Sequence, residues 1–223
     1  MTHGRALRHA LGLALVLLAG AGTAAAGPAE PPVAPTLEAL MAGMAETTGV
    51  EARFLERKEI ALLSEPIETR GTLVFLPPDR LVRITTEPSR SRLVIAGDRF
   101  SFRDAAGGEA VDLSANPLAR EFVDNFIVLF NGDLARLRER YEPELRSDGA
   151  SWTLVLRPRH RPLSDLIERI TLEGAGRRLR GMEMLERDGD RTTTRFEEVA
   201  VDRRFTPEEI ERWFAPSEAE AGE

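Results

Sequence analysis

Apolar and polar side chains alternate with a period of two along the central stretch from Gly71 to Arg103. This period is typical of strands with one buried face. Turn-forming residues divide the stretch into four short strands at Pro77-Pro78-Asp79, Glu87-Pro88-Ser89 and Gly97-Asp98. Connections this short can join only antiparallel neighbours, because a parallel crossover needs about a dozen residues or more. The pattern therefore predicts an antiparallel meander.

Strand-like alternation returns in the second half of the chain, from Glu142 to Val201. With an extended charged segment over 50–63 and a short strand over 109–113, the pattern predicts about ten or eleven strands. We therefore expect a mainly β (α+β) protein with a curved sheet or partial barrel. The alternation breaks between Phe196 and Val199, which predicts a β-bulge.

A strongly apolar helix is predicted between the two strand regions. Asn116 and Pro117 form a cap and a first-turn proline, and the helix should end at Asn131-Gly132. Phenylalanine recurs at every fourth position, as Phe122, Phe126 and Phe130. Further apolar residues widen this stripe, so the aromatic side must be covered by another part of the protein.

Three shorter helices are also predicted. Thr36 caps a helix that runs to about Thr48. A second short helix follows the phenylalanine helix, from Asp133 to Tyr141. Thr206-Pro207-Glu208-Glu209 is a capping box with proline in the first turn, and it predicts a short terminal helix.

The two ends of the chain differ in composition from the rest. Residues 1–26 have the three-part pattern of a secretory signal peptide, and their apolar run is too short to span a bilayer. Residues 27–35 are rich in proline and alanine and predict a disordered leader, whereas 216–223 form an acidic tail. We therefore expect an exported protein with one domain over 36–215.

Charge and cysteine usage exclude some classes of function. The formal net charge of the 223-residue chain is −7, which argues against nucleic acid as a partner. The chain has no cysteine, so no disulfide braces the fold. A chain of this length can bury a core of its own.

Candidate catalytic groups are sparse after residue 26. His160 is the only histidine there, and it lies in an arginine-rich loop with no nucleophile-elbow sequence in the chain. Glu183 and Glu197 could face each other across a hairpin as an acid–base pair, but their polar surroundings favour a solvated outer face. We therefore predict no enzyme, no cofactor and no metal site, with a hydrolase as the least favoured alternative.

Apolar residues exceed what a simple sandwich of this length needs. We expect them to line an interior between the sheet and the phenylalanine helix. The expected lining is Leu73, Phe75, Ile84, Leu93, Ile95, Phe100, Phe122, Phe126, Phe130, Trp152, Leu154 and Met182. Periodicity leaves two outcomes open, a packed core or a hollow that accepts an acyl chain. A hollow would bind hydrocarbon strongly, because each buried methylene contributes roughly 0.8 kcal/mol.

Two short motifs, together with the order of elements, carry a family resemblance. The motifs are G-T-L-V-F-L-P-P-D-R-L at Gly71 to Leu81 and L-V-I-A-G-D-R at Leu93 to Arg99. In layout, nearly the whole chain after the signal peptide resembles the outer-membrane lipoprotein carrier, or LolA-like, family. The resemblance implies an open antiparallel half-barrel closed by a helical lid, with an apolar hollow that carries acyl chains across the periplasm. The phenylalanine helix resembles the lid, and the meander resembles the wall.

One position departs from the family pattern. The lipoprotein carriers place an arginine immediately before the Pro-Asn that starts the strand after the first hairpin, and this arginine helps to hold the lid shut. Here Pro77 stands at that place, ahead of Pro78-Asp79, and Arg80 and Arg83 are only nearby. The departure favours a divergent branch that moves another lipid or a lipid-linked product.

The resemblance thus implies a monomeric periplasmic carrier without covalent chemistry. Its partners would be a lipid or acylated cargo, an inner-membrane donor and an outer-membrane acceptor. The alternative is a non-catalytic sensor or accessory module on the same fold, with an envelope protein or a lipid exporter as its partner.

Overall fold

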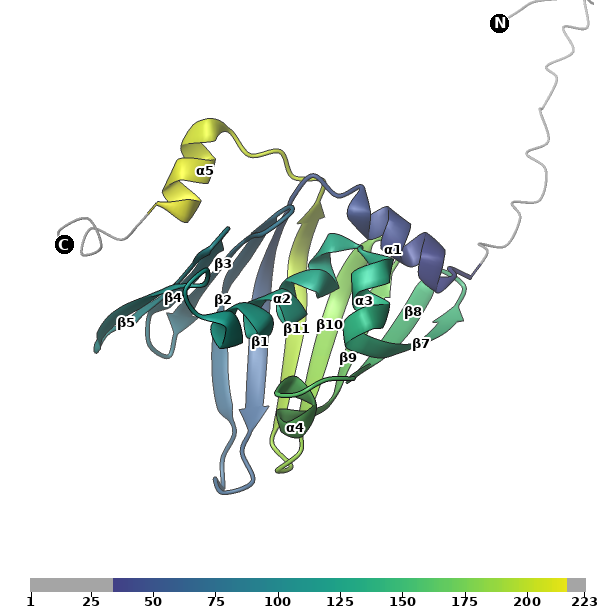
Figure 1. Ribbon diagram of the computed structural model, residues 1–223, viewed down its shortest axis with the longest axis horizontal. Helices are drawn as coiled ribbons and strands as arrows, with labels where there is room; N and C mark the ends of the chain where they lie inside the picture. Colours follow the sequence, from purple (N-terminus) through teal and green to yellow (C-terminus); the bar gives the residue numbers. More distant parts are fainter. Residues whose placement is uncertain (1–33, 216–223) are drawn as a thin grey trace, which may run out of the picture. The chain divides into compact units, whose positions relative to one another are not determined.

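The computed structural model describes residues 34–215, which are built around one antiparallel sheet (Figure 1). Its eleven strands lie in the order β6-β5-β4-β3-β2-β1-β11-β10-β9-β8-β7, which confirms the predicted open antiparallel half-barrel. The strands are β1 (Val50–Glu59), β2 (Ile67–Leu76), β3 (Arg80–Glu87), β4 (Ser91–Ala96), β5 (Arg99–Asp104), β6 (Gly107–Asp112), β7 (Tyr141–Asp148), β8 (Ser151–Pro158), β9 (Ile167–Ala175), β10 (Arg178–Glu186) and β11 (Arg191–Val201).

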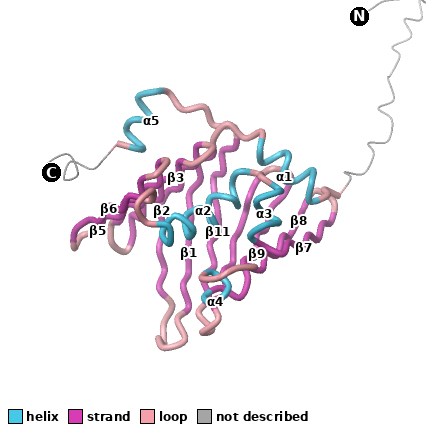
Figure 2. The backbone as a smooth tube through the Cα atoms, in the orientation of Figure 1, coloured by secondary structure: helices cyan, strands magenta, loops and turns pink. Residues whose placement is uncertain are grey.

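Two meanders make up the sheet, β1 to β6 and β7 to β11, and the pairing of β1 with β11 joins them. The chain therefore leaves the first meander at one edge of the sheet and enters the second at the opposite edge. Helices α2 (Pro117–Asn131) and α3 (Leu134–Arg140) make this crossing over one face, here called the inner face (Figure 2). The topology itself thus places α2 across the sheet.

Capping residues set the helix boundaries where the sequence predicts them. The Thr36 hydroxyl accepts a hydrogen bond from the Ala39 N–H (3.2 Å) at the start of α1 (Leu37–Ala45). The Asn116 side chain does the same for α2, which ends at Gly132 in the left-handed conformation (φ 68°). A cap of the same type begins α3, and α4 (Leu163–Leu166) is a single turn.

The inner face of the β7–β11 half is covered by α1, α2, α3 and α4. Leucine, isoleucine and aromatic side chains from these helices and from β7, β8 and β9 form one buried cluster. On the β1–β6 half, by contrast, the inner cluster receives its helical contacts within residues 34–215 from α2, through Val123, Ile127 and Phe130. The two halves of the sheet are therefore covered to different extents.

The outer face of β2, β3 and β4 is covered by α5 (Pro207–Phe214), where Val74, Val82 and Val94 pack against Phe214. Ile84 packs in this cluster, so its predicted place in the interior lining is wrong. The register explains the error, because Leu81 rather than Ile84 shares a face with Phe75 as its cross-strand partner. Apolar residues therefore occur on both faces of β3, Leu81 on the inner face and Val82 and Ile84 on the outer face beneath α5.

The predicted bulge is present in β11. Ala200 pairs with Glu51 and Glu197 with Arg53, so β11 contains one more residue than β1 over this interval, and Glu198 has a positive φ of 51°. The predictions for the signal peptide (1–26), most of the leader (27–35) and the acidic tail (216–223) concern parts of the chain that lie outside the described residues.

Candidate functional site

A small apolar cavity lies between the inner face of the sheet and helices α1 and α2. Its volume is about 50 Å³. It is lined by Met44, Thr47, Val50, Ala52, Leu73, Phe75, Leu129, Phe130, Leu172, Arg177, Leu179, Phe196, Val199 and Val201. A water molecule needs about 10–15 Å³ of such space, so the cavity has room for a few waters and is too small for an acyl chain. In the described conformation the interior is therefore close to the packed outcome.

Three of the predicted lining residues, Leu73, Phe75 and Phe130, border this cavity. Leu93, Ile95 and Phe100 lie on the same inner face and pack with Leu73 and Phe75 in one cluster. Their prediction as neighbours is thus consistent with the fold, although they do not line the cavity.

The other predicted residues lie elsewhere on the inner face. Trp152, Leu154 and the half-buried Phe126 belong to the packed cluster of the β7–β11 half. Met182 contacts both this cluster and the one on the β1–β6 half. Phe122 lies within α2, and its side chain is not among the described ones.

Sequence reasoning missed several lining residues, among them Val50, Ala52, Phe196 and Leu179. Two of them come from β1, whose charged neighbours suggested a solvated strand. The signal was present, because Val50, Ala52 and Phe54 occupy alternate positions before the first inward-facing charge at Glu56.

Outside the cavity, the inner face of β4 and β5 keeps an incompletely covered apolar surface. Leu93 and Phe100 are half-buried, and Phe102 remains 38% exposed. Phe102 pairs with Leu93, and Phe100 pairs with Ile95, so the four side chains share one face. We call the inward-facing residues of β2 to β5 the inner wall.

Aromatic packing closes α2 onto this wall. The rings of Phe75 and Phe130 lie 5.5 Å apart between centroids and are tilted by 38°. Ile127 is buried in the same cluster. Any guest between α2 and the wall must therefore replace these contacts.

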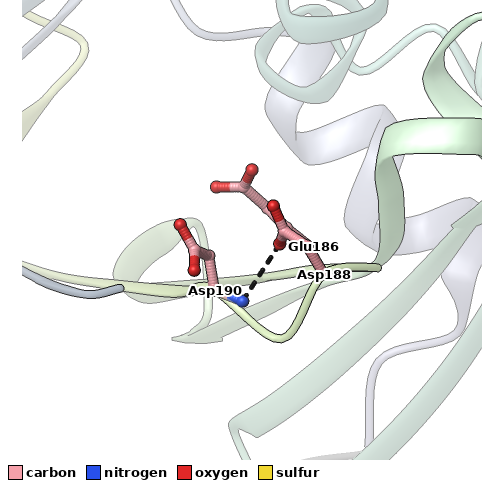
Figure 3. A group of neighbouring side chains, drawn as sticks. All are labelled: Glu186, Asp188 and Asp190. Carbon is pink, nitrogen blue, oxygen red and sulfur yellow. Dashed lines mark hydrogen bonds between the residues drawn. The ribbon is translucent and has the colours of Figure 1, made fainter. Parts of the chain in front are cut away.

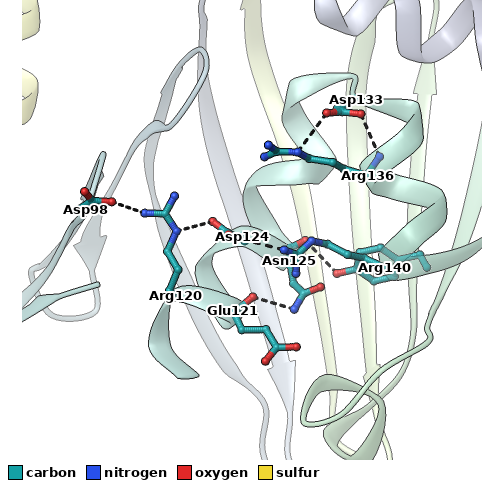
Figure 4. A network of polar contacts seen from close by, with 9 residues as sticks. Asp98, Arg120, Glu121, Asp124, Asn125, Asp133, Arg136 and Arg140 are labelled. Atoms are coloured by element: carbon teal, nitrogen blue, oxygen red, sulfur yellow. Dashed lines mark hydrogen bonds and ion pairs between the residues drawn. The ribbon is translucent and has the colours of Figure 1, made fainter. Parts of the chain in front are cut away.

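A series of ion pairs connects α2 to the β4–β5 turn, at the end of the inner wall, and to α3 (Figure 4). Arg120 on α2 contacts Asp98, in the turn between β4 and β5 (2.5 Å), and Asp124 one helical turn away (2.9 Å). Asp124 also contacts Arg140 of α3 (3.6 Å). Because Asp98 is 70% exposed and Arg120 38% exposed, water and salt weaken this link.

Tyr141, the first residue of β7, forms a hydrogen bond with the middle of α2. Its hydroxyl donates a hydrogen bond to the carbonyl oxygen of Asn125 (3.0 Å), and its side chain is fully buried. Burial raises the pKa of this phenol, because the charged form would lose its hydration. Tyr141 therefore stays neutral and keeps its hydrogen bond over the physiological range.

A polar cluster lies on the inner face beside the apolar wall. Arg83 of β3 donates a hydrogen bond to Glu56 of β1 (2.7 Å), and its guanidinium lies 4.3 Å from the centre of the Phe54 ring. Both charged side chains are partly buried, at 30% and 21% exposed. Thr69 and Thr194 also donate to the Glu56 carboxylate.

Three carboxylates gather in the β10–β11 hairpin, Glu186, Asp188 and Asp190 (Figure 3). Each of them already accepts a hydrogen bond from the protein. Glu186 contacts Lys58 (3.3 Å), Asp188 accepts from the Asp190 N–H (3.1 Å), and Asp190 accepts from the Ala61 N–H (2.9 Å). The cluster thus joins the hairpin to the end of β1.

The residues considered as catalytic candidates, Glu183, Glu197 and His160, do not lie together in one site. Glu183 pairs in register with Thr193, not with Glu197, and contacts Arg169 and Arg191. His160 is exposed, and its Nε2 lies 3.1 Å from the carbonyl oxygen of Glu139. The acid–base pair considered from the sequence is therefore not assembled.

In the part of the chain that the structure describes, no helix has the length and apolar character needed to cross a membrane. No curated protein matches the sequence.

Solved structures of similar fold have low sequence identity to this chain. A LolA superfamily protein from Nitrosomonas europaea is 12% identical, with 79% of this chain and 97% of that chain covered and a TM-score of 0.41. A DUF1329 family protein from Desulfovibrio piger is 10% identical (80% and 95% covered, TM-score 0.46). In the MucA/MucB complex of Pseudomonas aeruginosa the matching chain is 12% identical (77% and 57% covered, TM-score 0.42).

A profile of the family described as outer membrane lipoprotein carrier protein LolA-like matches residues 29–206. The match includes all eleven strands and helices α1 to α4. It confirms the resemblance that the two motifs of the meander suggested. The chain belongs to the family described as outer membrane lipoprotein carrier protein LolA-like.

Proposed function

We propose that this protein is a periplasmic carrier that binds acyl chains of a lipid or lipoprotein between α2 and the inner wall. It shuttles this cargo from an inner-membrane donor to an outer-membrane acceptor, as a monomer and without covalent chemistry or a cofactor. Residues 36–215 form its working domain after removal of the signal peptide over 1–26.

The observation that carries this proposal is the incomplete cover of the inner wall. Leu93, Phe100 and Phe102 lie side by side on one face and remain partly exposed. Water contact with this surface is unfavourable by roughly 25 cal/mol per Å² of apolar area. A hydrocarbon guest would therefore find an attractive surface beside a helix that already contacts the wall.

Cargo binding requires α2 to move away from the wall, because the closed cavity measures about 50 Å³. Opening separates Phe130 from Phe75 and exposes Ile127. An acyl chain of about fourteen carbons offers on the order of 10 kcal/mol of hydrophobic gain before costs, enough to replace these contacts. The guest thus supplies the apolar contacts that α2 gives up.

Mass spectrometry of protein purified gently from its native envelope tests the proposal, together with titration by a fluorescent fatty acid. We expect co-purifying lipid and saturable binding of the probe. The same fluorophore without its acyl chain is the control and should not bind. The carrier proposal would be refuted if the purified protein contained no lipid and did not bind the fluorescent fatty acid.

The free edge of the sheet at β6 favours the second candidate, a sensor or accessory module. Gly107, Gly108, Glu109 and Ala110 are exposed, and β6 pairs only with β5 among the described strands. Such an edge can accept a strand from a partner protein. Lipid-free protein that co-purifies with an envelope protein would favour this candidate over the carrier.

A further inference from the structure

One charged side chain interrupts the inner wall. In the row that crosses β2 to β5, Leu73 pairs with Arg83, Arg83 with Leu93, and Leu93 with Phe102. Leu73 also lines the cavity under α2. Arg83 is therefore an immediate neighbour of the apolar surface on which the proposed cargo would lie.

The fold positions the guanidinium of Arg83 by close packing. The side chain reaches across β2 to the Phe54 ring and to Glu56 on β1. Gly71 pairs with Phe54 at this crossing, where a Cβ atom would lie 1.8 Å from the Ile84 carbonyl oxygen and 2.9 Å from the Phe54 ring. Any larger residue at 71 would displace the ring that supports Arg83.

The carboxylate of Glu56 and the guanidinium of Arg83 differ in their remaining capacity to form hydrogen bonds. Both oxygens of Glu56 are engaged, Oε1 by Arg83 and Thr69 and Oε2 by Thr194. A guanidinium has five N–H donors, and within the described residues Arg83 uses one of them, toward Glu56. The cluster therefore offers donors, and a ligand that meets it must supply acceptors.

We infer that Arg83 anchors the head group of the cargo and that this head is an anion, a carboxylate or a phosphate, at the end of an acyl chain. The chain lies along Leu73, Leu93 and Phe102, and the head accepts hydrogen bonds from Arg83. Both geometry and charge fit, since arginine presents a planar fork to such anions and the Arg83 side chain is partly buried. The inference rests on the proposed carrier function.

Calorimetric titration of the protein with dodecanoate, dodecyl phosphate and dodecanol tests the anchor. The three probes share one chain and differ in the head. We expect either anion to bind about tenfold more tightly than the alcohol, the gain of a hydrogen bond to a charged group. Tighter binding of dodecyl phosphate would identify a phosphorylated lipid head, and tighter binding of dodecanoate a free fatty acid; either result supports the anchor.

Two variants should change the preference for the anionic probes over dodecanol in opposite directions. Arg83→Gln should abolish the preference for anions while leaving dodecanol affinity within about twofold, because the chain contacts remain. Glu56→Gln should increase the preference, because it removes the negative charge that faces the anion. Arg70→Gln is the matched control, since Arg70 is also a strand arginine in an ion pair (3.2 Å to Glu87) but is exposed on the outer face.

The outcomes separate this inference from the carrier proposal. Dodecanol binding without any preference for the anions overturns the anchor alone. Equal weakening of all three probes by Arg83→Gln, or an unchanged preference in Glu56→Gln, also overturns it, because a merely structural ion pair predicts that result. Failure of the wild-type protein to bind any of the three overturns both. Thermal unfolding of each variant confirms that it is folded, and Glu56→Gln decides the question if Arg83→Gln does not fold.

Discussion

The two halves of the sheet carry similar apolar side chains on the inner face but receive different cover. On the β7–β11 half, Leu154, Leu156 and Ile170 are at most 1% exposed beneath four helices. On the β1–β6 half, Phe102 is 38% exposed, and among the described helices α2 is the one that packs in the inner cluster. The inner face of β8 and β9 is therefore fully packed, whereas that of β4 and β5 leaves apolar surface accessible.

Truncation in the packed half should have the largest effect. Leu156→Ala leaves a cavity at a fully buried site, so we expect the free energy of unfolding to fall by about 2–5 kcal/mol. Leu93→Ala on the half-covered wall removes the same atoms and should cost less than about half of that, because solvent and neighbours can fill the space. Urea unfolding of both variants measures the difference. Equal losses would mean that the two halves are packed alike.

Truncation on the inner wall should affect binding more than stability. Phe102→Ser removes an aromatic contact for the cargo, so we expect about tenfold weaker binding of a fluorescent fatty acid, corresponding to the loss of a buried aromatic side chain. The change in unfolding free energy should stay small, because Phe102 is already partly exposed.

Leu55→Ser is the matched control for this variant. Leu55 is 39% exposed, nearly the same as Phe102, but it lies next to the inward-facing Phe54 in β1 and so points to the outer face. Affinity for the fatty acid should be unchanged. If both variants weaken binding equally, the inner wall is not the binding surface.

Local patterns predict the strands, the caps and the bulge because the forces that set them act over a few residues. Asn116, Gly132 and the capping box at Thr206 are examples, and the structure confirms all three. The order of strands followed from short connections in each meander. The β1–β11 pair that joins the meanders was not predicted, because it brings together strands from opposite ends of the domain.

The interior lining was harder to predict because it depends on distant parts of the chain. Leu81 and Ile84 are both apolar residues of β3, but they lie on opposite faces of the sheet. Helix α5 covers Val82 and Ile84, so these two residues lie on the outer face. Likewise, Glu56 and Arg83 resemble surface charges in a strand until β2 brings them together. A hollow cannot be told from a packed core by alternation, since both bury the same face.

Loosening the ionic link between α2 and the wall should have a smaller effect. Asp98→Asn removes the partner of Arg120 in the β4–β5 turn, which we expect to cost about 0.2–1 kcal/mol and to be masked by salt. Hydrogen exchange of the α2 amides at low and high salt measures this opening. Arg136→Gln is the control, because Arg136 pairs within its own region with Asp133 (3.5 Å) and does not reach the wall. Identical exchange in the two variants would exclude the link as a restraint on α2.

The smallest expected effect is a pH dependence on the outer face. The Thr206 N–H and, secondarily, Arg203 lower the pKa of Glu209 in the capping box of α5. A carboxyl whose pKa is lowered by folding stabilises the folded form above its unfolded pKa, and this contribution is lost as the pH falls below about 4.3. Acid should therefore loosen α5 from the outer face before it affects the packed half.

The two tryptophans report on these regions separately, Trp213 on α5 and Trp152 in the packed cluster. In a Trp152→Phe background, acid titration should shift Trp213 emission to longer wavelength, and Glu209→Gln should remove most of the pH dependence of this shift. Glu211→Gln is the control, since Glu211 lies in the same helix outside the capping box, and the ion pair with Arg203 is made by Glu209 (2.7 Å). If Glu211→Gln and Glu209→Gln titrate alike, the capping box does not couple α5 to pH. Trp152 is followed in the same way in a Trp213→Phe background, and if it responds at a higher pH than Trp213 does, the packed half is the weaker one.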